Sequence, residues 1–204
     1  EHITLKAVRM MKEVDVIAAP GTDVKETLAY RIAVQAVPEI EQKEMLPIDM
    51  PMTMDKELLL KAHKRGAETI EKVLAEGKSV GFITLGDTTV YSTFSYLEKM
   101  VKNHGFETVY ISGITSFCAV AASLGIPLTE WQEPLHVIPA VHQLDDKLAL
   151  DGSYVLMKSG RQMPKVKEIL KASGRKVNMV ENCGLPNENK YYSVEEIPDG
   201  AGYF

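Results

Sequence analysis

Apolar and polar positions in the first half of the chain form alternating blocks that predict helices and short buried strands in turn. Four apolar residues near the start are spaced four, four and three positions apart, which is the spacing of one helix face. They are Ile3, Ala7, Met11 and Val14. The apolar run VDVIAAPG (14–21) that follows ends in Pro-Gly, so it predicts a buried strand that stops at a turn.

The next blocks continue this alternation. Composition predicts a helix over residues 24–37 and the longest helix over residues 53–77, with Asp55 as a cap near its start and Gly77 as its stop. Between them, the run 44–51 contains two prolines, which remove backbone donors. We therefore expect an edge strand or an extended passage there.

The middle of the chain predicts two further pairs of strand and helix. SVGFITLG (79–86) is short and β-branched, which is typical of a strand buried on both faces of a parallel sheet. Apolar residues then recur at helical spacing, which predicts a helix that begins between Thr89 and Ser92. The next strand is expected at 107–112 and the next helix at 115–125.

This order of elements predicts an α/β protein with a largely parallel first sheet. Beyond about residue 111 the strands are denser and the helices shorter, which indicates a second lobe. We expect a first lobe at residues 1–112 and a second at 113–204.

Composition narrows the function classes. The 204 residues are 45% hydrophobic and 25% charged, as in globular chains that form one large domain or two small ones. A net charge of −5 argues against nucleic acid as the main partner. No apolar run of about 18 residues predicts a membrane span, and the cytoplasm is the default location.

The sequence lacks the common motifs of metal, dinucleotide and nucleophile chemistry. Cys118 and Cys183 come without a CxxC or Cys/His cluster, so each is expected to be a small buried residue rather than a nucleophile. The histidines show no ligand spacing, and no protein-bound metal is expected. GxGxxG and GxxxxGK[ST] are both absent.

One predicted strand end is unusually polar. In LGDTTVYST (85–93), Gly86 and Asp87 precede a row of hydroxyl residues, and Tyr91 adds a phenol. A helix cap explains one such side chain, and on spacing alone it is the favoured explanation. The number of polar groups favours a ligand site instead, because ligands of open α/β sheets bind beyond the carboxyl ends of strands.

Three more predicted strand ends carry glycine. Gly113 precedes Thr115 and Ser116, for which helix capping is the alternative. Lys158 and Arg161 flank a third turn, either as a solvated loop or as a site for carboxylates or phosphates. The fourth, VENCGLPNE (180–188), has an ordinary loop as its alternative.

Together these segments resemble one known family, the tetrapyrrole (corrin/porphyrin) methyltransferases. ITLGDTTVYSTFSYL looks like the family's Gly-Asp-Pro loop, with Thr88 in place of proline. Its YSTFSYL extension and GITSFCAVAASLGIPL resemble the branch that methylates C20 of precorrin-2 or cobalt-factor II. The segments ITLKAVRMMKEVDVIAAP, PMTMDKELL, YVLMKSGR and VENCGLP match in order, so the resemblance spans the chain.

The resemblance implies two α/β lobes with the active site in the cleft between them, in a fold unlike the Rossmann methyltransferases. It implies S-adenosylmethionine as methyl donor, a tetrapyrrole substrate and a homodimer. The family's cofactor contacts fall on Leu85, Gly86, Asp87, Val90, Thr115, Ser116, Met157 and either Cys183 or Gly184.

Within that frame we expect Asp87 to be the base that removes the meso proton and Tyr91 to orient the substrate. Lys158 and Arg161 are expected to bind the substrate carboxylates. The family's first strand and its GxGPGDP loop are expected upstream of residue 1.

Two alternatives stay open. One is a tetrapyrrole methyltransferase acting at another ring carbon, and the other is a non-catalytic tetrapyrrole-binding protein.

Overall fold

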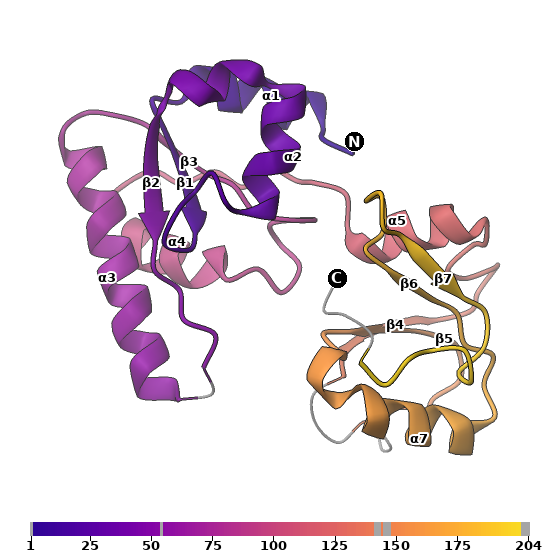
Figure 1. Cartoon of the computed structure of the whole chain (residues 1–204). Helices are drawn as coiled ribbons and strands as arrows, with labels where there is room; N and C mark the ends of the chain where they lie inside the picture. Colours follow the sequence, from indigo (N-terminus) through magenta and orange to yellow (C-terminus); the bar gives the residue numbers. More distant parts are fainter. Residues whose placement is uncertain (1, 54, 141–143, 145–147, 201–204) are drawn as a thin grey trace. The chain divides into compact units, whose positions relative to one another are not determined.

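The computed structural model describes residues 2–53, 55–140, 144 and 148–200 (Figure 1). They divide into two compact units, one up to Thr115 and the other from Ser116 onward. Each unit has its own sheets and core.

The first unit is built on three parallel strands in the order β2-β1-β3. They are β1 (Val16–Pro20), β2 (Glu44–Ile48) and β3 (Val80–Phe82). The central strand β1 pairs with β2 from Val16 opposite Glu44 onward and with β3 on its other side. The expected parallel sheet and the edge position of the proline-containing strand are thus confirmed, since Pro47 lies in β2 at the edge.

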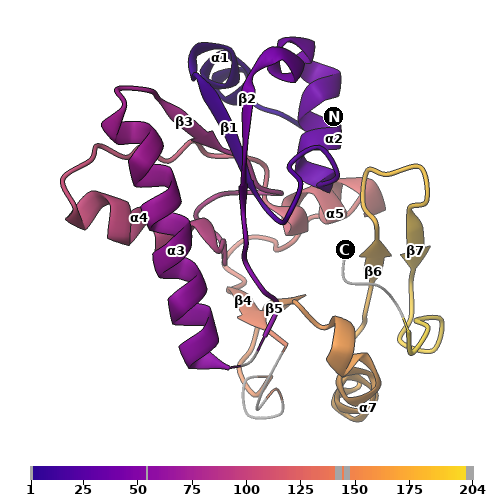
Figure 2. The same cartoon turned by 60° about the vertical axis from the view of Figure 1, so that its left-hand side comes forward.

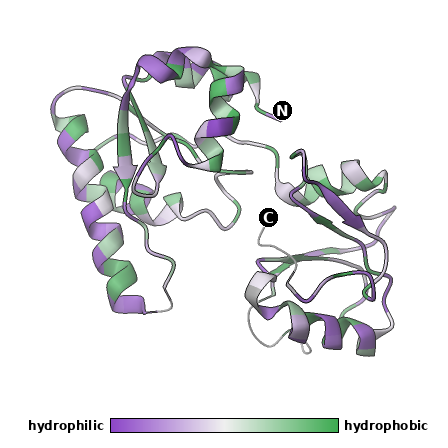
Figure 3. Ribbon diagram, in the orientation of Figure 1, coloured by the Kyte–Doolittle hydropathy of each residue, from purple (hydrophilic) through white to green (hydrophobic). Residues whose placement is uncertain are grey.

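Helices cover both faces of this sheet. They are α1 (Leu5–Glu13), α2 (Leu28–Ala36) and the short η1 (Pro38–Gln42) on one face, and α3 (Lys56–Ala75) and α4 (Phe94–Asn103) on the other. Figure 2 shows α3 and α4 together on one side of the strands. Apolar and polar residues alternate along α3 (Figure 3), as a helix with one buried face requires.

The alternation of side chains along β1 supplies both halves of the core. Ile17 and Ala19 pack with α1 and α2, whereas Ala18 packs with α3 and α4. Residues of β1 from Val16 to Ala19 are fully buried, so this strand is apolar on both faces.

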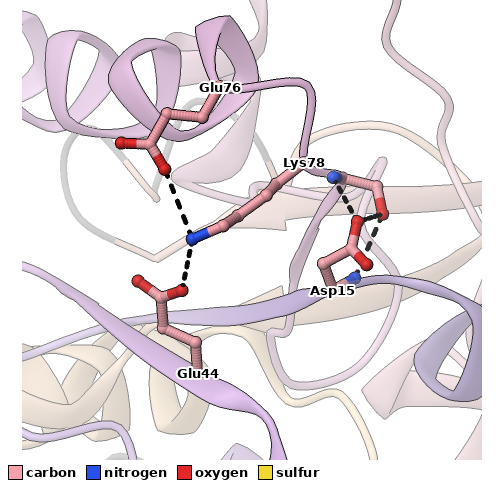
Figure 4. A network of polar contacts seen from close by, with 5 residues as sticks. Asp15, Glu44, Glu76 and Lys78 are labelled. Atoms are coloured by element: carbon pink, nitrogen blue, oxygen red, sulfur yellow. Dashed lines mark hydrogen bonds and ion pairs between the residues drawn. The ribbon is translucent and has the colours of Figure 1, made fainter.

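Polar contacts join the starts of the three strands. Asp15, just before β1, accepts hydrogen bonds from the amide and hydroxyl of Ser79, just before β3 (Figure 4). Lys78 forms ion pairs with Glu44 of β2 at 2.9 Å and with Glu76 at 3.3 Å. These groups lie at the end of the sheet opposite to the loop after β3.

Two predictions for this unit are wrong. Residues 107–112, expected as a strand, form no strand and pair with none of the described strands, although two of their side chains bind helix α4. Thr108 Oγ1 and Tyr110 Oη donate to the buried carboxylate of Glu98 at 2.6 and 3.3 Å. The helix expected from 89–92 begins only at Phe94, since Tyr91 has φ = 50°, which a helix does not allow.

The described residues of the second unit form two small sheets. Strands β4 (Leu135–Pro139) and β5 (Ser153–Met157) pair in parallel, and β6 (Met179–Glu181) and β7 (Asn189–Tyr191) pair antiparallel. The helices described in this unit include α5 (Ser116–Leu124), η2 (Gly160–Gln162) and α7 (Met163–Ser173). Val166 and Leu170 of α7 pack with Ile138 and Leu156 of the β4-β5 sheet, while α5 contacts β6.

Candidate functional site

The loop after β3 is organised by one carboxylate. Asp87 is 7% exposed, and its Oδ1 accepts hydrogen bonds from the backbone N–H of Thr89 at 2.8 Å and from the Thr89 hydroxyl. Its Oδ2 accepts from Ser112 Oγ at 2.7 Å and from the backbone N–H of Gly113 at 2.9 Å. Asp87 therefore ties the first predicted loop to the second rather than capping a helix.

Four donors around one carboxylate favour its charged form. The hydroxyl and backbone N–H of Thr89, followed by Ser112, lower the pKa of Asp87 from 3.8 to about 2, against the opposing effect of burial. Asp87 is therefore an anion at neutral pH. A carboxyl of such low pKa is a weak proton acceptor, and the base role expected for Asp87 from the sequence stays a prediction.

The two loops also cross at their glycines. A Cβ placed on Gly113 would lie 2.1 Å from the carbonyl oxygen of Gly86, and Gly86 itself has φ = 71°. Thr88 Oγ1 donates to the carbonyl oxygen of Ile111 at 3.1 Å, which adds another bond between the loops. Thr88, which replaces the family's proline, thus has a contact of its own that proline would lack.

The other predicted residues of the first unit lie on or beside these loops. Leu85 and Val90 are half-buried, and Tyr91 is 43% exposed in its left-handed conformation. Thr115 comes two residues after Gly113, and its buried hydroxyl has no hydrogen-bond partner in the structure. An unpaired buried hydroxyl is costly in a folded protein, so the Thr115 side chain is a polar group still able to form a hydrogen bond.

The remaining predicted residues lie in the second unit. Ser116 begins α5, and Met157 ends β5, where it is half-buried. Lys158 follows with φ = 62° and an exposed side chain. Arg161 lies in η2, and its side chain is outside the described part of the structure.

Cys183 and Gly184 form a turn after β6. Gly184 has φ = 79°, and its backbone N–H donates to Glu188 Oε2 at 2.7 Å. Burial and the neighbouring Glu188 raise the pKa of the Cys183 thiol, so it stays protonated at neutral pH. The expectation of two buried cysteines is wrong for Cys118, which is exposed, whereas Cys183 is half-buried.

Sequence reasoning missed the residues that hold these loops. Ser112 and Ser123 are single serines without a motif, and Glu188 lies at the end of the fourth candidate segment, where only Cys183 and Gly184 were predicted to matter. The only signal was proximity, since Ser112 directly precedes Gly113 and Glu188 follows Gly184 by four residues.

No helix in the described ranges is long and apolar enough to cross a membrane. Within the same ranges, no cluster of three or more His, Cys, Asp or Glu side chains could hold a metal ion.

Comparison with known proteins places this chain in a family. Residues 1–198 match the Tetrapyrrole (Corrin/Porphyrin) Methylases, so the chain belongs to that family and the resemblance predicted from the motifs is confirmed. A probable cobalt-precorrin-2 C(20)-methyltransferase of Methanocaldococcus jannaschii is 35% identical over 187 residues, which are 91% of this chain and 79% of that protein. A precorrin-2 C(20)-methyltransferase of a Sinorhizobium species is 29% identical and covers 100% of this chain and 87% of its own length.

Solved structures show the same fold. The cobalt-precorrin-4 methyltransferase CbiF has a TM-score of 0.71 at 19% identity, covering 95% of this chain and 80% of its own. The methyltransferase CobJ has a TM-score of 0.71 at 20% identity, covering 99% and 85%. The α/β fold of the tetrapyrrole methylase type, expected from the sequence, is therefore confirmed.

Proposed function

We propose that this protein transfers a methyl group from S-adenosylmethionine to C20 of precorrin-2 or cobalt-factor II in cobalamin synthesis. The observation that carries the proposal is the 35% identity to the Methanocaldococcus protein over 91% of the chain. The YSTFSYL segment, which resembles the C20 branch, favours this ring carbon over the others.

Residues of the first unit are suited to binding the methyl donor. Gly86 and Gly113 keep two backbones close together without side chains, and Thr115 has a buried hydroxyl with no partner. We assign donor binding there to Leu85, Gly86, Val90 and Thr115. In the second unit we assign it to Ser116, Met157 and the turn at Cys183 and Gly184.

The donor supplies a methyl group on a sulfonium, which is already activated for transfer to an electron-rich carbon. The chain then has mainly to bind and orient, and correct orientation alone can account for about 7–11 kcal/mol of a reaction barrier. We propose that Asp87 serves this purpose by holding the crossing of the two loops, while the meso proton that leaves C20 after methyl transfer passes to water. Tyr91 remains our candidate for orienting the substrate.

The substrate carries several carboxylates while the protein has a net charge of −5, so local cations are needed. Lys158, which is exposed at the end of β5, and Arg161 in η2 are our candidates. Reversal of charge at Lys158 should raise KM for the tetrapyrrole and leave the affinity for S-adenosylmethionine unchanged.

The proposal is tested with protein expressed from its own complete reading frame. Incubation with methyl-labelled S-adenosylmethionine and either cobalt-factor II or metal-free precorrin-2 should yield one product labelled at C20, assigned by NMR. Label at another carbon would make this a methyltransferase of different regiospecificity. Absence of S-adenosylmethionine binding in calorimetry would favour a non-catalytic tetrapyrrole-binding protein.

Two further expectations accompany this function. We propose that the protein acts as a homodimer, which sedimentation equilibrium measures. We also propose that it works in the cytoplasm, which cell fractionation measures.

A further inference from the structure

We propose that Glu188 is a positioning residue that holds the turn at Cys183 and Gly184 against helix α5 and thereby sets the affinity for S-adenosylmethionine. The inference rests on the proposed function, because it concerns how this chain shapes the donor site.

Glu188 bridges two parts of the second unit that are far apart in sequence. Its Oε2 accepts the hydrogen bond from the backbone N–H of Gly184 at 2.7 Å. Its Oε1 accepts from the hydroxyl of Ser123, near the end of α5, also at 2.7 Å. One carboxylate thus uses both oxygens to connect the turn with the helix.

Lys190 closes the connection into a ring. Its Nζ lies 3.4 Å from Glu188 Oε1 and donates to the backbone carbonyl oxygen of Ser123 at 2.5 Å. The side chain of Glu188 is only 22% exposed, so these bonds are partly shielded from water. The N–H of Gly184 and the Ser123 hydroxyl also lower the pKa of Glu188 to about 2, and the carboxylate is therefore charged throughout the neutral range.

The turn needs such support because its backbone is unusual. Asn182 has φ = 54° and Gly184 has φ = 79°, so two left-handed residues flank Cys183. Asparagine and glycine adopt this conformation more readily than other residues but also adopt extended backbone, so contacts from outside the turn decide which conformation is kept. Without the bond to Gly184 we expect the turn to sample other conformations.

Two segments with predicted donor contacts meet through this carboxylate. The turn carries Cys183 and Gly184, and α5, which carries Ser123, begins at Ser116. Loss of Glu188 should therefore lower donor affinity without removing any group that touches the donor.

The test uses Glu188→Ala, Glu188→Gln and the control Glu196→Gln. Glu196 is matched because its Oε2 accepts a backbone N–H four residues earlier, that of Tyr192 at 2.8 Å, while its side chain is exposed. In the ligand-free protein, hydrogen exchange at the Gly184 amide should quicken about tenfold in Glu188→Ala, as expected for loss of a charge-assisted hydrogen bond. Exchange in β4 and β5 should not change, which shows that the unit remains folded.

Calorimetry should show a Kd for S-adenosylmethionine about tenfold higher in Glu188→Ala, with a smaller rise in Glu188→Gln and none in Glu196→Gln. In turnover assays KM for S-adenosylmethionine should rise, while kcat and KM for the tetrapyrrole stay near wild type.

Three outcomes would overturn the inference. Unchanged Gly184 exchange would show that Glu188 does not hold the turn. Faster exchange with an unchanged Kd would show that the turn does not set affinity. A wild-type protein that binds no S-adenosylmethionine would refute the proposed function itself, and the inference with it, and the wild-type titration separates this case from the first two.

Discussion

The substitution Asp87→Asn tests whether one buried carboxylate holds the crossing of the two loops. Asparagine keeps the shape of the side chain but turns one oxygen into an N–H₂ group. Each carboxylate oxygen of Asp87 faces a backbone N–H, from Thr89 on one side and from Gly113 on the other. In either orientation, the N–H₂ group of the amide therefore points at one of these backbone N–H groups, so two hydrogen-bond donors face each other without an acceptor.

The expected loss follows from the pKa of this group. Lowering of the Asp87 pKa from 3.8 to about 2 corresponds to about 1–2 kcal/mol of folding free energy, after allowance for solvent screening. Because the folded-state pKa lies below the unfolded one, this stability is present in full above the unfolded pKa. It is lost as the pH falls from about 4 through about 2.

Hydrogen exchange of β1 amides in urea, followed by mass spectrometry, measures the stability of the first unit. The single tryptophan, Trp131, belongs to the second unit, so its fluorescence reports on the wrong part of the chain. Asp23→Asn is the matched control, because Asp23 is exposed and its Oδ1 accepts the N–H of Lys25 at 2.9 Å.

At pH 7, Asp87→Asn should be less stable than wild type by about 1–2 kcal/mol, and the difference should narrow steadily toward pH 2. The control should match wild type at every pH. A difference that stays constant with pH, or one no larger than that of the control, would refute the assignment of this stability to the charged carboxylate.

Three further substitutions test contacts that stabilise the first unit. Gly113→Ala should lower the free energy of unfolding of the first unit by about 1–3 kcal/mol, because its Cβ would lie 2.1 Å from the Gly86 carbonyl oxygen. Unchanged hydrogen exchange of β1 amides in urea would refute the close crossing of the two loops. Leu97→Ala should cost about 2–5 kcal/mol in the same measurement, since Leu97 is fully buried, and a loss below 1 kcal/mol would contradict its place in the core. Asp55→Ala removes a cap that accepts two backbone N–H bonds at the start of α3, so the free energy of unfolding should fall by about 0.5–2 kcal/mol. Hydrogen exchange in the first turn of α3 equal to that of wild type would show that the cap does not stabilise the helix.

Hydrophobic spacing predicted most elements of the first unit correctly. The edge position of β2 followed from Pro47, and the cap of α3 followed from Asp55. Both are local effects, since a missing backbone donor or a capping oxygen acts within a few residues.

The errors arose where a distant contact decided the outcome. Residues 107–112 have the composition of a strand but pair with none of the described strands; the carbonyl oxygen of Ile111 instead accepts a hydrogen bond from Thr88 of the loop after β3. The start of α4 moved to Phe94 because Tyr91 adopts a left-handed conformation, which no pattern of apolar residues indicates.

The sequence by itself determined the α/β class, the family and the polar character of the strand ends, because periodicity and ordered motifs are visible along one chain. Only the tertiary structure decided what those polar groups do. It shows that Asp87 links two loops through Ser112 and Gly113, and that Glu188 in the other unit accepts hydrogen bonds from Ser123 and Gly184. The physical reason is that the pKa and the role of a carboxylate depend on the donors that surround it, and here those donors come from residues that are distant in sequence, such as Ser112 and Ser123.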